Sequence, residues 1–233
     1  MKTLTIRLTA PLQSYGNEAT FSRRTSNDYP TKSAVLGMVA AALGYRRTDE
    51  RILALNDLDF AVRIDQVGKM LTDYQTVEWK KDTRKVTYRD YLQDAVFVVA
   101  LGSPDEQFID EIKVALRHPY FPLFLGRRSN APAGVLKIQE FLDTTPVTVL
   151  RNLTWQAADW YQRRSQHQTV EIIADANLIP DGRSAMVKDR VVSFDQRHRS
   201  HSYRAVAKTR VALSDLKAQV HDPETHHDIM NRL

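Results

Sequence analysis

The sequence contains no cysteine among its 233 residues, which excludes disulfides, zinc sites with thiolate ligands and cysteine nucleophiles. It contains no apolar run near the ~20 residues that a membrane-spanning helix needs, and its N-terminus lacks a signal-peptide core. No phosphate-binding GxxxxGK[ST] loop, GxSxG nucleophile motif or glycine-rich dinucleotide fingerprint occurs. These absences predict a cytoplasmic protein that contacts no membrane.

The charge of the chain is positive and unevenly distributed. Lysine and arginine outnumber aspartate and glutamate by 33 to 28, which gives a net charge of +5, and the pI is about 9.4. Basic residues concentrate between residues 80 and 89 and between residues 183 and 210. Such a balance favours a polyanionic partner, of which a nucleic acid is the commonest kind.

The order of the periodic segments predicts an α+β fold. Alternating or continuous apolar runs predict strands, and longer apolar runs with capping residues predict helices. The predicted elements are a strand at 3–9, a helix at 31–44, a short helix at 50–56, strands at 58–67 and 94–102, a helix at 104–117 and a strand at 121–125. Apart from the short helix, this is the βαββαβ order of the ferredoxin-like, RRM-like fold.

This predicted unit occupies residues 1–142 and contains an insertion at about residues 69–91. The insertion mixes basic and aromatic side chains, so we expect it to project from the body and to contact nucleic acid. Its candidate contacts are Tyr74, Lys80, Lys81, Arg84 and Lys85. The alternative is a solvated hairpin with extended lysine side chains. Residues 143–233 predict a smaller β-rich C-terminal subdomain and a tail, with a helix at 147–153 and strands at 170–174 and 203–213.

A turn at residues 125–129, with the sequence LGRRS, is the first candidate binding site. Gly126 allows a sharp turn or a close approach of the backbone to a ligand. Arg127, Arg128 and Ser129 offer guanidinium and hydroxyl groups that suit phosphate oxygens. The alternative is a surface turn whose arginines pair with carboxylates, and the residue types alone do not separate the two.

The loop before the first predicted helix is the second candidate. A helix N-terminus offers unpaired backbone N–H groups and a positive dipole, which attract anions. The candidate residues along this loop and at the helix start are Gln13, Ser14, Tyr15, Arg23, Arg24, Lys32 and Ser33. The alternative is ordinary capping of the helix by Thr31.

His118, which follows Arg117, is the nearest approach to a catalytic residue. A metal-independent ribonuclease needs a general base and a cation near the 2′-hydroxyl. His118 with Arg117, or a nearby tyrosine, could supply both, but the sequence does not show the positioned partners that catalysis needs. The histidines near the C-terminus have no recognised ligand spacing. The sequence therefore predicts no catalytic residue, no metal and no cofactor, with an endoribonuclease as the alternative function.

Four blocks, taken together and in order, resemble the CasD-type subunits of Cascade, the type I-E CRISPR surveillance complex, within the RAMP superfamily. They are LTIRLTAPLQSYG, YPTKSAVLGMVAAALGYRRTDE, DYQTV with YRDYLQDAVFVVAL, and PYFPLFLGRRS. The blocks span residues 3 to about 130, and VVSFDQRHRSHSYRAV adds a looser match nearer the C-terminus.

The resemblance implies a ferredoxin-like body with a protruding thumb at the insertion. It implies a non-catalytic subunit that binds the 5′ handle of the CRISPR RNA, caps the filament of CasC-type backbone subunits and contacts the CasA-type large subunit, which reads the target DNA. The turn at 125–129 and the first loop would then line the handle-binding groove, and the thumb would reach over the spacer side.

Overall fold

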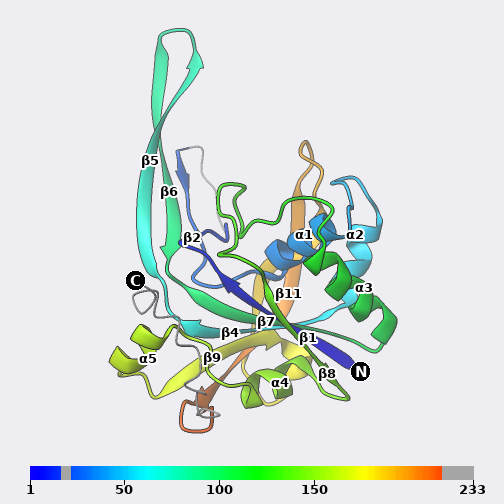
Figure 1. Ribbon diagram of the computed structural model, residues 1–233. Helices are drawn as coiled ribbons and strands as arrows, with labels where there is room; N and C mark the ends of the chain where they lie inside the picture. The colour runs from blue at the N-terminus through cyan, green and yellow to red at the C-terminus, as the bar shows by residue number, and fades with distance from the viewer. Residues whose placement is uncertain (17–21, 217–233) are drawn as a thin grey trace, which may run out of the picture.

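A seven-stranded antiparallel sheet forms the centre of this computed structural model, which describes residues 1–16 and 22–216 (Figure 1). From edge to edge its strands are β10 (Ser184–Ser193), β11 (Ser200–Ala212), β9 (Thr169–Asp175), β4 (Asp59–Gln66), β7 (Val96–Ser103), β1 (Lys2–Thr9) and β8 (Lys137–Leu142). The helices are α1 (Lys32–Ala42), α2 (Arg51–Ala54), α3 (Glu106–Arg117), α4 (Pro146–Asn152) and α5 (Asp159–Arg164), with short 3-10 turns at Leu55–Asp57 and Ala176–Leu178.

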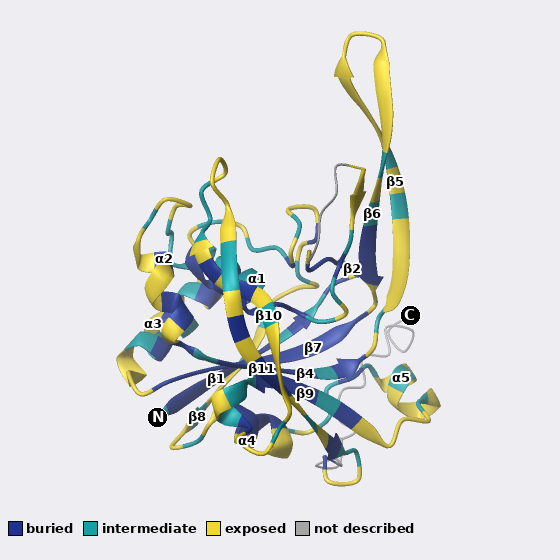
Figure 2. Ribbon diagram, turned by 180° about the vertical axis from the view of Figure 1, so that it is seen from behind, coloured by how far each residue is buried: buried dark blue, intermediate teal, exposed yellow. Residues whose placement is uncertain are grey.

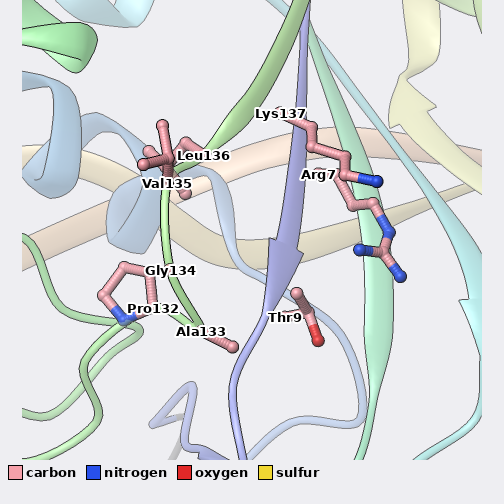
Figure 3. Close-up of a pocket in the computed structure, with 8 residues that line it drawn as sticks. All are labelled: Arg7, Thr9, Pro132, Ala133, Gly134, Val135, Leu136 and Lys137. Carbon is pink, nitrogen blue, oxygen red and sulfur yellow. The ribbon is translucent and has the colours of Figure 1, made fainter. Parts of the chain in front are cut away.

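The central sheet is covered on both faces, which gives the body three layers. Every residue of β7 is buried, and its side chains alternate between two apolar clusters. Phe97 and Leu101 pack with α1 and α3 on one face, whereas Val98 and Ala100 pack with α4 on the other. Figure 2 shows the buried residues gathered on these central strands. The continuous apolar run of β7 therefore reflects a strand that is covered on both sides.

The structure confirms most of the predicted elements and the mixed α+β class. β1, β4 and β7 coincide with the first three predicted strands, and α1, α2 and α3 coincide with the first three predicted helices. Thr31 and Asp105 cap α1 and α3, because each side chain accepts a hydrogen bond from a backbone N–H of the first turn. α4, β9 and β11 likewise lie where the sequence predicts them.

The predicted strand at residues 121–125 is wrong. Proline at positions 119 and 122 removes two backbone donors, and the backbone groups of Leu125 bond instead to Asn130 and Ser14. The strand that pairs with the outer side of β1 is β8, with Ile6 opposite Ile138. β8 escaped prediction because it is a sheet edge with only two half-buried residues, Ile138 and Phe141, so its apolar pattern is weak.

The C-terminal strands extend the same sheet. β9 pairs with β4, with Val62 opposite Ile173, and β11 pairs with β9 on its other side. The sheet is therefore continuous across the predicted boundary at residue 142, and the division of the chain into two parts stays a prediction. β10 was not predicted either, because bulges interrupt its pairing with β11 and six of its ten residues are exposed. The predicted tail from residue 217 lies outside the described residues.

A charged pair is buried on the polar face of β4, where the alternating sequence suggests exposure. Arg63 is 0% exposed, and its Nε and Nη2 atoms donate to the carboxylate of Asp65 at 2.6 and 2.8 Å. The remaining donors of Arg63 bind the carbonyl oxygens of Leu150, Leu153 and Thr154. The backbone N–H of Gln156 donates to Asp65 at 2.6 Å. This network fixes the segment after α4 to the sheet.

A second, smaller sheet carries the projecting insertion. β5 (Lys69–Lys80) and β6 (Thr83–Gln93) form a long antiparallel hairpin, and β6 also pairs with β2 (Leu12–Gln13) and β3 (Arg23–Arg24). The outer half of the hairpin stands clear of the body (Figures 1 and 2), and the insertion predicted at about 69–91 corresponds to it. We call this hairpin the thumb.

Shortening the thumb is expected to leave the body folded. All residues from 77 to 85 are exposed, and the ion pair between Glu78 and Arg84 lies within this tip. Replacing residues 77–85 with an Asn-Gly turn would retain the pairing of Thr76 with Val86 beside a turn type that suits hairpins. Thermal unfolding followed by circular dichroism would compare the shortened and full chains. A lost or strongly lowered transition would show that the tip supports the body.

Candidate nucleic-acid interface

The register of the second sheet places basic side chains on one of its faces. β3 lies parallel to β6, with Arg24 beside Arg89 and Arg23 beside Tyr88. Side chains that are neighbours in register share a face, so Arg24 and Arg89 point one way and Arg23 points the other. Asp90 lies on the face of Arg23, with its Oδ2 atom 3.7 Å from the Arg23 Nε atom. The carboxylate is thus separated from Arg24 and Arg89.

The LGRRS turn is held against the base of this sheet. The backbone N–H of Ser14 donates to the carbonyl oxygen of Leu125 at 3.2 Å. Gly126 has a φ of +87°, and a Cβ atom built there would lie 1.6 Å from the Ser14 carbonyl oxygen. Only glycine allows this approach, because it has no Cβ and adopts positive φ without strain. The turn therefore places the next residue, Arg127, against the second sheet.

Arg127 lies over the face that carries Arg24 and Arg89. Its Nε donates to the Ser14 hydroxyl at 3.2 Å, its Nη2 donates to the Arg24 carbonyl at 3.3 Å, and its guanidinium sits 4.8 Å from the centre of the Tyr91 ring. Burial lowers the pKa of Arg127, and the neighbouring Arg89 and Arg24 charges lower it further, while Tyr91 opposes them. The guanidinium is stacked, half-buried and close to like charges.

Two guanidinium nitrogens in this cluster are buried without a partner. The Nη1 atom of Arg127 and the Nε atom of Arg89 are shielded from solvent, and neither has a hydrogen-bond acceptor within the described residues. Buried donors in folded proteins are nearly always satisfied, so each exception requires an explanation. An anionic oxygen is the acceptor that guanidinium groups bind most strongly. We call the residues Arg24, Arg89, Tyr91 and Arg127 the arginine cluster.

The first three candidates of the first loop are buried and position the cluster. Gln13 donates to the Ala95 carbonyl at 2.7 Å and accepts a hydrogen bond from the Tyr15 hydroxyl at 2.7 Å. Ser14 donates to the Asp90 carbonyl at 2.9 Å. Tyr15 is 2% exposed, and burial raises its pKa. These side chains hold the loop against the sheet and do not face solvent.

Lys32 and Ser33 lie in a different environment. The backbone N–H of Lys32 donates to Asp189 at 2.9 Å, and its ammonium lies 3.0 Å from Asp175. Both carboxylates also bind Arg204, at 2.6 and 2.7 Å. The anion at this helix N-terminus is therefore an internal carboxylate, and the Lys32 ammonium pairs with a second one. The Ser33 hydroxyl lies 3.3 Å from that of Thr31, the capping residue.

The remaining candidates are exposed. Arg23, Arg24, Arg128 and Ser129 all present side chains to solvent, and the Ser129 hydroxyl donates to the Asn130 side chain at 3.2 Å. The thumb candidates Tyr74, Lys80, Lys81, Arg84 and Lys85 are exposed as well. Register places Lys85 on the same face of β6 as Arg89 and Tyr91, since residues two apart along a strand share a face.

Arg89 and Tyr91 belong to the cluster although the sequence analysis did not select them. A strand period of two through Lys85, Arg89 and Tyr91 was the available signal. This periodicity did not single out Arg89 and Tyr91, because basic and aromatic residues occur throughout the insertion. Only the approach of the LGRRS turn distinguishes them.

The candidate catalytic residue and the possible metal ligands can be located in the part of the chain that the structure describes. His118 ends α3 and is exposed, and its imidazole makes no hydrogen bond to a described residue. Residues 1–16 and 22–216 contain no group of three or more acidic, histidine or cysteine side chains that could hold a metal ion. None of the helices in these ranges is long and apolar enough to cross a membrane.

Comparisons with known proteins agree on one family. A family model described as "CRISPR-associated protein (Cas_Cas5)" matches residues 3–212. The CRISPR system Cascade subunit CasD of Escherichia coli (strain K12) is 32% identical over 182 residues, which cover 70% of this chain and 81% of that protein.

Solved structures share the fold over almost the whole chain. A chain of a "CRISPR RNA-guided surveillance complex" is 28% identical with a TM-score of 0.74, and the match covers 91% of this chain and 90% of that one. A second structure, "Crystal structure of Cas protein", is 27% identical with a TM-score of 0.72 and coverages of 92% and 97%.

Proposed function

Because the chain belongs to the Cas5 family of CRISPR-associated proteins, we propose that it is a non-catalytic, RNA-binding subunit of a CRISPR surveillance complex of the Cascade type. The relative with 32% identity is a Cascade subunit, and a similar solved chain comes from an RNA-guided complex.

The arginine cluster carries the proposal. The buried donors of Arg89 and Arg127 have no acceptor among the described residues, and a phosphate oxygen would satisfy them. Arg127 also donates to the backbone of β3, at the Arg24 carbonyl. Arg24 and Arg128 are exposed beside them and extend the basic surface. Tyr91 fixes the plane of the Arg127 guanidinium, which favours bidentate contact with a phosphate.

The finer assignments follow from the family resemblance. The RNA segment in the groove would be the 5′ handle of the CRISPR RNA, with Arg127, Arg128 and Ser129 forming one wall. The thumb would reach over the spacer side. The chain would cap a filament of CasC-type subunits, contact the CasA-type subunit, and meet target DNA only indirectly, in the cytoplasm. The body would be ferredoxin-like, which the strand order β8-β1-β7-β4 supports.

Replacing the two arginines of the cluster that have unpaired donors, Arg89→Gln with Arg127→Gln, is expected to weaken binding of handle RNA by about 2–5 kcal/mol. Hydrogen bonds to charged groups contribute ~1.5–3 kcal/mol each, and the two variants together remove at least two. Titration of the purified chain with handle RNA by fluorescence anisotropy would measure the loss. Glutamine preserves much of the packing of each side chain, so circular dichroism is expected to be unchanged.

The matched control removes two arginines elsewhere. Arg117 and Arg151 are exposed at the C-terminal ends of α3 and α4, so Arg117→Gln with Arg151→Gln lowers the net charge equally. This control is expected to lower affinity much less, through the general electrostatic effect alone. Equal losses in the two double variants would mean that the cluster is not a specific site.

A further inference from the structure

A second aromatic and basic surface lies at the root of the thumb, formed by α5 and the residues after it. Figures 1 and 2 both place α5 beside the base of β5. The backbone N–H of Ala158, the capping residue of α5, donates to the side chain of Gln66 at 3.1 Å. The indole Nε1 of Trp155 donates to the Asp65 carbonyl at 2.7 Å. Gln66 is the last residue of β4, so α5 is anchored immediately before the thumb begins.

This surface contains a cavity of about 450 Å³ that is open to solvent. Its lining residues are Trp160, Tyr161, Arg164, Ser165, Gln166 and His167. The Tyr161 ring meets the Trp160 ring edge-on, with centroids 5.7 Å apart, and lies within 22° of parallel to the His167 ring. Trp160 is nevertheless 49% exposed. The rings support one another while about half of the Trp160 side chain stays exposed, which suits a platform on which a base can stack.

The charge around the cavity is positive. Arg163 and Arg164 end α5, and neither makes an ion pair with any residue in the described ranges. The only carboxylate between residues 159 and 167 is that of Asp159, at the opposite end of the helix. An occupant with a flat aromatic face and a negative charge would therefore complement both features of the cavity.

We propose that the α5 cavity binds one unpaired nucleotide of a single-stranded nucleic acid, with its base stacked on Trp160 and its phosphate beside Arg164. An open cavity holds a free small molecule weakly. A polymer already bound nearby presents its nucleotides at a high effective concentration, so a shallow site suffices. This site is separate from the arginine cluster and extends the nucleic-acid surface past the root of the thumb.

The test uses the full chain with its arginine cluster intact, so that a bound strand presents its nucleotides to the cavity. Short single strands of RNA and of DNA, each with one 2-aminopurine, report stacking through fluorescence quenching. In this chain, Trp160→Leu is expected to reduce the affinity roughly fivefold or more, the loss typical of one base stack, and to abolish the quenching. Arg164→Gln is expected to reduce the affinity and to leave the quenching of the bound strand.

Tyr120→Leu is the matched control, because Tyr120 is 74% exposed and lies outside the cavity. It is expected to change neither affinity nor quenching. Preference for the RNA strand would identify the guide as the source of the nucleotide, and preference for the DNA strand would identify the target. Unchanged binding and unchanged quenching in the Trp160 and Arg164 variants would overturn the proposal. That result would leave the assignment of the arginine cluster intact.

Discussion

The variant Asp65→Ala is expected to lose about 3–5 kcal/mol of the free energy of unfolding. Asp65 accepts two hydrogen bonds from Arg63 and one from the backbone of Gln156. Without its carboxylate, Arg63 stays a fully buried cation with only carbonyl oxygens around it, and an unpaired buried charge carries this penalty. Urea denaturation followed by circular dichroism would measure the loss. The segment after α4 would also lose one of its bonds to β4, the hydrogen bond from the Gln156 backbone N–H to the Asp65 carboxylate.

The chain supplies a closely matched control in Asp49→Ala. Asp49 pairs with Arg51, two residues away as Arg63 and Asp65 are, and binds it through both carboxylate oxygens. Here the arginine side chain is 67% exposed, so water replaces the lost partner. We expect a much smaller change in stability than for Asp65→Ala. Similar losses for both variants would show that burial does not set the strength of the inner pair.

The variant Gly126→Ala is expected to displace the LGRRS turn and to abolish specific RNA binding. The new Cβ would lie 1.6 Å from the Ser14 carbonyl oxygen, where no relaxation of a side chain can help, because the clashing atom is backbone. Moving the turn separates Arg127 from Ser14 and Tyr91. The positive φ adds a strain of ~1–3 kcal/mol. Fluorescence anisotropy with handle RNA would measure the loss of binding, and urea denaturation would measure the loss of stability.

The variant Gly134→Ala is the control that separates the effect of the steric clash at Gly126 from the effect of backbone strain. Gly134 also has a positive φ, +79°, but nothing lies within 4 Å of its built Cβ. It is expected to lose stability through backbone strain alone and to bind RNA like the unchanged chain. If Gly126→Ala behaved like Gly134→Ala in both assays, the close contact with Ser14 would not position the arginine cluster.

The strongly periodic elements were predictable because local pattern decides them. The continuous run of β7, the capped helix α1 and the alternation of β1 each carry their own signal. β8 and β10 were missed because edge strands bury few side chains, and their pairing with β1 and β11 determines them. The predicted strand at 121–125 failed because prolines and the bonds of Leu125 take up the backbone groups that a strand requires.

In the candidate site, too, some features were predictable from local sequence and others depend on contacts with distant residues. Gly126 and the two arginines after it were recognisable as a turn that suits an anion, because residue chemistry is visible in sequence. That Gln13, Ser14 and Tyr15 are buried supports of the turn was not visible, since their hydrogen-bond partners lie far along the chain. Lys32 looked like a ligand at a helix N-terminus, but Asp189, 157 residues away, occupies that position.

The sequence by itself determined the class of fold, the projecting basic hairpin, the family resemblance and the LGRRS turn, because each rests on neighbouring residues. Tertiary structure decided which charges are free to bind a ligand. Arg63, Lys32 and Arg204 are paired with carboxylates of the body, whereas Arg89 and Arg127 keep donors without acceptors among the described residues. The physical reason is that a cation's availability depends on the atoms that surround it after folding, and distant segments supply those atoms.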